Sequence, residues 1–261
     1  MSNFLITKHD FISATQRWKD WVALAWYDFS LPYRRTLIGP LWKVVQFFVW
    51  VVALSIIFKQ SELEETKNYV LYVSCGVMAF GFISEVISSS PNIFLQNSTQ
   101  ILNIPIPFMM LIYRSVCLSI INFLFQLPVL FLIFLCIGKF DLCIFTLFLT
   151  LLIYFITAIW TSLLLAMIGV RFKDLKYSVQ SVMRLLFFIS PVFWSPGLSK
   201  TRTLLATYNP ISYFMEIFRL PFFGSFPSIK MWSVVLFINI IGIISTTIIF
   251  IFFKRRISLW L

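Results

Sequence analysis

The chain has 261 residues, of which 60% are hydrophobic, 19% aromatic and only 12% charged. Soluble domains average about 45–50% apolar and about 25% charged residues, so the composition excludes an ordinary soluble enzyme and indicates an integral membrane protein. The net charge of +11 would indicate nucleic-acid binding in a soluble protein. In a membrane protein it indicates orientation in the bilayer, and no nucleic-acid partner is expected. Six spans of about 20 residues would leave no room for an ATP-hydrolysing domain, so any such motor would be a separate chain.

The N-terminal arm, residues 1–36, is expected to contain an amphipathic helix over residues 13–30. Its apolar positions recur at the spacing of one helical face, and three of them are Trp18, Trp21 and Trp26. The opposite face is charged, so the helix is too polar to span a bilayer. The tryptophans favour a helix that lies in the membrane interface, and an amphipathic helix packed against a protein partner is the alternative.

Six apolar runs are predicted to span the membrane, which makes the expected fold all-α and integral to the bilayer. The predicted spans cover residues 37–58, 69–90, 108–137, 142–170, 177–194 and 231–253 of a transmembrane domain over residues 37–253. Prolines divide residues 196–229 into apolar pieces of about 10–14 residues, which are too short to span a bilayer. We expect two short re-entrant helices there, between the fifth and sixth spans. Residues 254–261 form a tail.

The orientation follows from the distribution of lysine and arginine. Six spans put both termini on one side of the membrane, and that side carries twelve basic residues against seven on the other. Because basic loops remain in the cytoplasm, both termini are expected there and the re-entrant segment is expected on the outside.

Ionisable side chains within the apolar runs are the first candidates for function, because a charge inside the bilayer is costly. Arg184 lies eight residues into the fifth run, about 12 Å deep at 1.5 Å per residue. We expect it either to face a water-filled or sugar-filled pathway or to pair with Glu85. Arg114, near the start of the third run, is expected to extend to the membrane surface. Glu216 and Arg219, three residues apart, are expected to form a local ion pair.

Aromatic residues next to polar groups are candidates for contact with sugars, which stack on aromatic rings through their C–H surfaces. On this ground the candidate channel-lining residues are Trp42 and Gln46 in the first run and Trp194 at the outer end of the fifth, together with Arg184. Most other aromatic residues are expected to face lipid or neighbouring helices.

Motifs for chemistry are not found in the sequence. There is no Walker A pattern, no carboxylate pair and no nucleophile with a base, so the chain is expected not to be an enzyme. The four cysteines lie inside apolar runs without paired spacing, so we expect neither disulfides nor a metal site. No cofactor is expected in this chain.

Four segments carry a resemblance to a known family. They are YRRTLIGPLW (33–42), GVRFKDL (169–175), FFISPVFW (187–194) and YNPISYFMEIFRLPFFG (208–224). In this order, over almost the whole chain, they resemble the permease subunits of type-2 ABC transporters that export polysaccharides and polyol phosphates. The last three are most similar to the O-antigen, or lipopolysaccharide, export permeases.

The resemblance implies a homodimer of six-helix subunits in the bacterial inner membrane, with two separate ATPase subunits that bind ATP and Mg²⁺. It further implies that the first and fifth spans line a channel for a polyprenyl-diphosphate-linked glycan. The stretch that would contact the ATPase comprises Asn97, Ser98, Thr99, Gln100, Ile101, Leu102 and Asn103. Arg34 and Arg35, expected at the cytoplasmic membrane surface, are candidates to contact the diphosphate, and ordinary positive-inside anchoring is the alternative.

Other functions remain open at this point. A permease for capsular polysaccharide or teichoic acid would share these features, and an ABC permease for small lipids or drugs would share the six-helix plan. A membrane enzyme that acts on lipid-linked sugars is a third alternative. It would need an acidic motif at a membrane surface, and the sequence shows none.

Overall fold

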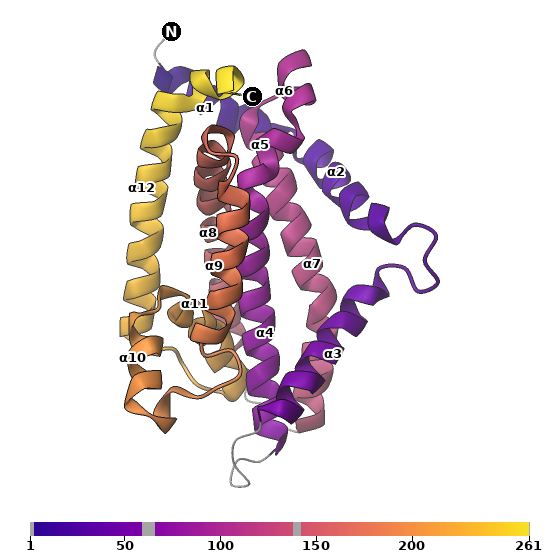
Figure 1. Cartoon of the computed structure of the whole chain (residues 1–261), viewed down its shortest axis with the longest axis vertical. Coiled ribbons are helices and arrows are strands. Elements are labelled where there is room, and N and C mark those ends of the chain that lie inside the picture. Colours follow the sequence, from indigo (N-terminus) through magenta and orange to yellow (C-terminus); the bar gives the residue numbers. More distant parts are fainter. Residues whose placement is uncertain (1–2, 59–65, 138–141, 261) are drawn as a thin grey trace.

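The computed structural model of the chain describes residues 3–58, 66–137 and 142–260, and every regular element within these ranges is a helix. Four long helices form a bundle: α4 (Thr66–Ser89), α7 (Phe108–Ile137), α8 (Ile144–Arg171) and α12 (Ile229–Trp260). Figure 1 shows both chain ends at one end of this bundle, together with α5 (Ile93–Gln96) and α6 (Ser98–Asn103). At the opposite end lies α10 (Lys200–Tyr208). The loops predicted around residues 59–65 and 138–141 fall outside the described residues.

The other elements are shorter. They are the helices α1 (Asn3–Gln16), α2 (Trp18–Ser30), α3 (Leu41–Ile57), α9 (Leu175–Ile189) and α11 (Pro210–Arg219), and the 3-10 turns η1 (Leu31–Tyr33), η2 (Ser90–Asn92), η3 (Pro196–Leu198) and η4 (Leu220–Phe223). The all-α expectation is therefore confirmed for the described residues. Two short helices, α10 and α11, occupy the proline-divided segment in which two were predicted.

The number of spans is supported in part. In the described ranges, four helical stretches are long and apolar enough to cross a membrane: Asn68–Gln96, Phe108–Cys136, Ile144–Arg171 and Ile229–Lys254. The predicted first and fifth spans correspond to α3 and α9, which have 17 and 15 residues. At 1.5 Å per residue they are about 26 Å and about 22 Å long, shorter than the hydrocarbon core of about 30 Å. The chain is a multi-pass membrane protein, and six spans remain a prediction.

Local backbone chemistry explains why α3 and α9 are shorter than their apolar runs. Gly39 has a φ of +57°, a left-handed conformation that glycine adopts without strain, and Pro40 follows as the residue before the first turn of α3. At the far end of α9, Ser190 is extended, with φ −82° and ψ 148°. The residue before a proline is disfavoured in the helical region, so Pro191 ends α9 at Ile189 instead of at Trp194.

The N-terminal arm also differs from its prediction. The helix expected over residues 13–30 is divided at Arg17, whose backbone leaves the helical region, into α1 and α2. The ring of Trp21 packs on Tyr113 of α7 with centroids 5.6 Å apart, whereas Trp18 and Trp26 are exposed. Trp26 also lies near α7, with its ring centroid 6.4 Å from that of Phe125, so Trp21 and Trp26 both face α7 while Trp18 is exposed.

An ion pair joins α2 to α7. Arg114 Nε and Nη2 donate to the two carboxylate oxygens of Asp28 at 2.6 and 2.7 Å, the bidentate geometry that guanidinium and carboxylate favour. The sequence did not predict Asp28 as the partner of Arg114, and the expectation that Arg114 extends to the membrane surface stays a prediction.

Close packing and side-chain hydrogen bonds hold the bundle together. The rings of Phe82, Tyr154 and Phe218 stack in succession, with centroids 5.6 and 6.0 Å apart, and so join α4, α8 and α11. The Tyr154 hydroxyl also donates to the backbone carbonyl of Phe214 at 2.8 Å. On the other side of α8, Gly242 of α12 faces the indole of Trp160 so closely that a side-chain carbon there would overlap the ring.

Asp10 connects three helices at the end of the bundle where the chain termini lie. Its carboxylate accepts from the backbone N–H groups of Phe108 and Met109 at 3.3 and 3.1 Å. These N–H groups lie in the first turn of α7, where no preceding turn supplies an acceptor. Lys254 Nζ of α12 lies 3.0 Å from the same carboxylate, so α1, α7 and α12 are joined through one buried side chain.

Candidate functional site

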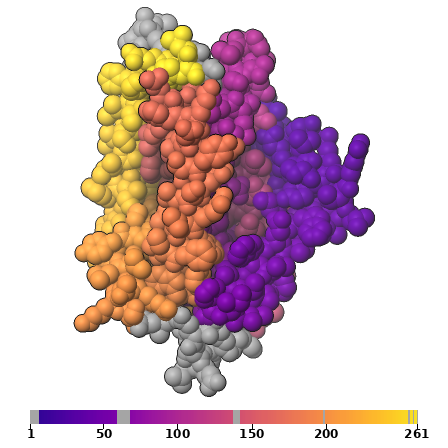
Figure 2. All heavy atoms as spheres, viewed as in Figure 1, coloured from indigo at the N-terminus to yellow at the C-terminus, as the bar shows by residue number. Residues whose placement is uncertain are grey.

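A groove of about 1140 Å³ lies between α3, α4 and α9. In Figure 2 the surface is hollowed between the orange α9 and the purple α3. The groove brings together polar side chains from several of the apolar helices, and it is the candidate functional site.

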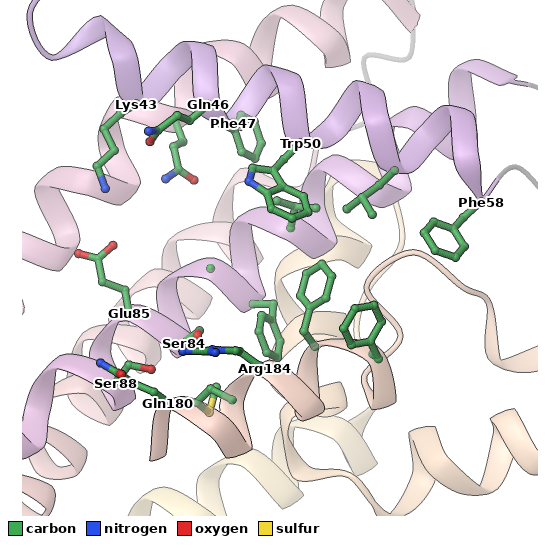
Figure 3. A pocket seen from close by; sticks show the side chains of 18 residues that line it. Lys43, Gln46, Phe47, Trp50, Phe58, Ser84, Glu85, Ser88, Gln180 and Arg184 are labelled. Atoms are coloured by element: carbon green, nitrogen blue, oxygen red, sulfur yellow. The ribbon is translucent and has the colours of Figure 1, made fainter. Parts of the chain in front are cut away.

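One end of the groove is polar. Its polar lining residues come from α3, α4, α7 and α9, and they are Lys43, Gln46, Ser84, Glu85, Ser88, Gln126, Gln180 and Arg184. Figure 3 shows several of these side chains converging from opposite walls. Amide, hydroxyl and charged groups inside an apolar bundle are costly unless they are satisfied or functional.

The other end of the groove is aromatic and aliphatic. It is lined by Trp50, Leu54, Phe58, Val77, Phe80, Phe187 and Phe188. On α3 and α9 the polar residues precede the aromatic ones, and on α4, which runs in the opposite direction (Figure 1), they follow them. The three helices therefore change from polar to apolar at the same level, and the groove as a whole is amphipathic.

Among the described residues, Arg184 does not form the ion pair with Glu85 that was one of its two expected roles. Glu85 accepts a hydrogen bond from Asn122 Nδ2 at 2.6 Å, and the side chain of Lys43 points toward its carboxylate (Figure 3). Arg184 lines the groove instead, with its guanidinium directed toward Ser84 of α4. None of the ion pairs found among the described residues includes Arg184.

The four candidate channel-lining residues separate into two groups. Gln46 and Arg184, far apart in the sequence, both line the groove. Trp42 is 44% exposed on α3 and is not part of the lining. Trp194 is only 6% exposed, and its Nε1 donates to the carbonyl of Phe188 at 3.0 Å. The indole of Trp194 is buried because the chain leaves the helix at Ser190.

A second feature, the aromatic loop (residues 190–194), lies beside the apolar end of the groove. Phe193 of this loop lies against Phe58 at the end of α3, with ring centroids 4.3 Å apart. The hydroxyl of Tyr69 lies 2.9 Å from the carbonyl oxygen of Phe58 and 2.7 Å from that of Phe193. Tyr69 of α4 thus ties the last turn of α3 to the aromatic loop.

The aromatic loop is also held by Arg219 of α11, which is only 2% exposed. Its Nη2 donates to the carbonyl of Pro191 at 2.7 Å, and its Nη1 donates to Glu216 at 2.5 Å. The predicted ion pair is therefore confirmed, but its deep burial was not predicted. A helical wheel contains the signal, since Ser212, Met215 and Arg219 follow one another at steps of three and four residues on the buried face of α11.

The two arginines proposed for diphosphate contact lie in the elbow (residues 31–40) that connects α2 to α3. Both are exposed, and the Arg34 guanidinium stacks 4.8 Å from the ring centre of Tyr27. The elbow begins just after Phe29, which packs on Phe125 with centroids 4.5 Å apart. Phe125 lies near the middle of α7, so the elbow starts beside the middle of that helix and not beside its first turn.

The stretch proposed to contact an ATPase contains a short helix. Residues 98–103 form α6, at the end of the bundle that also holds both chain termini (Figure 1). Leu102 and Ile104 are exposed there. The surface that this segment offers is uncharged, with apolar and hydrogen-bonding groups.

Comparison with known proteins gives the class that this architecture belongs to. The model of the ABC-2 type transporter family matches residues 19–223, from the first turn of α2 to the end of η4, and so includes every residue that lines the groove. The chain belongs to the ABC-2 type transporter family and is a transporter membrane subunit. It is similar to the O-antigen export system permease protein RfbA of Myxococcus xanthus, with 20% identity over 210 residues, which cover 77% of this chain and 79% of RfbA.

Proposed function

We propose that this chain is the permease subunit of an ABC transporter that exports a lipid-linked polysaccharide of the O-antigen type across the bacterial inner membrane. The amphipathic groove between α3, α4 and α9 carries this proposal. Its amide and hydroxyl groups, such as Gln46 and Ser84, suit the hydroxyls of a sugar. Its aromatic residues, such as Trp50 and Phe187, offer ring faces on which sugars stack.

The assembly we propose contains two copies of the chain and two ATPase subunits that bind ATP and Mg²⁺. In each copy α3 and α9 would face the channel, since these helices form the walls of the groove. The ATPase would bind at α6, where Leu102 and Ile104 offer exposed apolar contact. Both termini would then be cytoplasmic, and α10 and α11 would be re-entrant helices on the outer side.

The proposed mechanism couples closure of the ATPase subunits to opening of the channel. A polyprenyl-diphosphate-linked glycan would then move outward along the groove. A permease for capsular polysaccharide or teichoic acid is the second candidate, because the same groove chemistry suits those polymers. The similarity to RfbA favours the O-antigen type.

The test is deletion of the gene, followed by staining of surface polysaccharide and extraction of lipid-linked polymer from the cells. Export predicts that surface polymer is lost, that lipid-linked polymer accumulates inside, and that a plasmid copy restores the surface polymer. Unchanged surface polymer, with no accumulation inside, would show that the chain does not export a glycan. A changed sensitivity to drugs, with polymer unaltered, would indicate a permease for small molecules.

A further inference from the structure

The polar end of the groove carries more positive than negative charge. Its ionisable residues are Lys43 on α3, Arg184 on α9 and Glu85 on α4. The carboxylate of Glu85 accepts a hydrogen bond from the amide of Asn122 at 2.6 Å. The side chain of Lys43 also points toward this carboxylate (Figure 3). Glu85 is attracted electrostatically to Lys43, and Arg184 is a second positive charge at this end of the groove.

Arg184 has surroundings that would bind an anion. Its side chain is exposed, and it belongs to none of the ion pairs of the described chain. Gln180, one helical turn earlier on α9, lines the same end of the groove, and Ser84 and Ser88 face it from α4 (Figure 3). These amide and hydroxyl groups can donate hydrogen bonds to the oxygens that a guanidinium attracts.

The energetics also call for a countercharge. If α9 is the fifth span that the six-span topology predicts, Arg184 lies in the middle of a membrane helix, where a cation costs about 2.5–3.5 kcal/mol on insertion scales. A guanidinium pairs best with a planar or tetrahedral oxyanion, to which it donates two parallel hydrogen bonds. The described residues supply Arg184 with no carboxylate, so the oxyanion would come from a bound molecule.

We propose that the polar end of the groove is a binding site for a phosphate-type oxyanion, with Arg184 as its main contact and Gln180, Ser84 and Ser88 as hydrogen-bond donors. The aromatic end, beginning at Phe187 one turn further along α9, takes the uncharged part of the same molecule. The assignment of this oxyanion to the diphosphate that joins a glycan to its lipid rests on the proposed function. The oxyanion chemistry itself rests only on the groove.

Binding measurements on the purified full-length chain in phosphatidylcholine nanodiscs test this proposal. The probes are farnesyl diphosphate, farnesol and inorganic pyrophosphate, and the variants are R184Q, R184K and K173Q. Lys173 is an exposed residue between α8 and α9, outside the groove, so K173Q removes the same charge elsewhere. R184K keeps the positive charge and removes the bidentate geometry of the guanidinium. Binding by R184K would show that a protein changed at this position still folds.

We expect R184Q to weaken farnesyl diphosphate binding by about tenfold or more, the loss of one charged hydrogen-bonding group. R184K should lose less affinity for farnesyl diphosphate. R184Q and R184K should bind farnesol as the wild type does, and K173Q should bind farnesyl diphosphate as tightly as the wild type. Tighter binding of farnesyl diphosphate than of pyrophosphate assigns the site to a lipid diphosphate, whereas equal binding assigns it to the free oxyanion. Either result supports the site.

Two results would overturn the proposal. The first is that R184Q binds farnesyl diphosphate as tightly as the wild type, and the second is that K173Q loses as much affinity for it as R184Q does. Because these measurements need neither polymer nor ATPase, they fail or succeed independently of the gene deletion. A deletion that abolishes surface polymer, combined with unchanged binding by R184Q, would leave the export function intact and remove only this site.

Discussion

The guanidinium of Arg219 lies over the ring of Tyr72, 3.6 Å from its centroid, and joins α11 to α4 at a buried position. The Tyr72 hydroxyl in turn lies 2.9 Å from the carbonyl oxygen of Trp194. Arg219 also donates to the carbonyl of Pro191. The two residues therefore hold both ends of the aromatic loop against α4.

Replacement of Arg219 by Met should destabilise the protein by about 3 kcal/mol, because it leaves Glu216 and the carbonyl of Pro191 without their charged donor. The measurement is reversible unfolding of the purified protein in mixed micelles. K200M, which removes an exposed cation from the neighbouring α10, is the control and should change stability little. Equal stability of R219M and the wild type would show that the buried arginine contributes no net stabilisation.

Replacement of Tyr69 by Phe removes only the hydroxyl that bridges the carbonyls of Phe58 and Phe193. We expect a loss of about 1 kcal/mol and faster backbone hydrogen exchange in residues 190–194, since one tie to the aromatic loop is gone. Hydrogen-exchange mass spectrometry in micelles measures this. In the matched variant Y213F, the lost hydroxyl contacts Thr207 on the surface, and exchange in residues 190–194 should not change. Equal hydrogen exchange in residues 190–194 of Y69F and Y213F would show that the Tyr69 hydroxyl does not hold the aromatic loop.

Replacement of Gly242 by Ala should destabilise the packing of α8 and α12 by about 1–3 kcal/mol, because the added methyl overlaps the indole of Trp160. Gly81 of α4 is a matched control, since an added side-chain carbon there has no neighbour within 4 Å. G81A should be neutral or stabilising, as alanine favours a helix more than glycine does. Thermal unfolding of both variants checks the difference, and a G242A protein as stable as G81A would contradict the observed packing.

Simultaneous replacement of Arg34 and Arg35 by Gln tests the proposed contact of the elbow with a lipid diphosphate. We expect surface polysaccharide to fall while the protein is expressed and inserted normally, because the positive charges that attract the anion are removed. Surface staining and immunoblotting of membranes measure the two quantities. Normal surface polymer at normal expression would assign the arginines to membrane anchoring alone.

The sequence predicted the long helices well and the end of α9 poorly. The third run, residues 108–137, coincides with α7, because a largely apolar stretch of that length is typical of a membrane-spanning helix. The end of α9 was predicted too late, although the signal for it was present: Ser190 precedes Pro191, and the residue before a proline leaves the helical region.

The groove could be predicted only in part. Gln46 was a candidate because it is a polar group near the aromatic Trp42, and Arg184 because a charge within an apolar run is unusual; both line the groove. The pairing of Glu85 with Asn122 and the direction of Lys43 depend on which helices are neighbours, which periodicity in one segment cannot show. Trp194 was misjudged for the same reason, since its burial depends on the turn that follows α9.

The central claim, that the groove between α3, α4 and α9 carries the cargo, is tested most directly by blocking it chemically. In a background with alanine at all four native cysteines that still exports polymer, Q46C places one thiol in the groove and I241C places one on the exposed side of α12. Both are treated in cells with a bulky thiol-specific reagent, and mass spectrometry measures the extent of labelling. The account predicts that labelled Q46C stops delivering polysaccharide to the surface while labelled I241C continues. Undiminished export by fully labelled Q46C would contradict it.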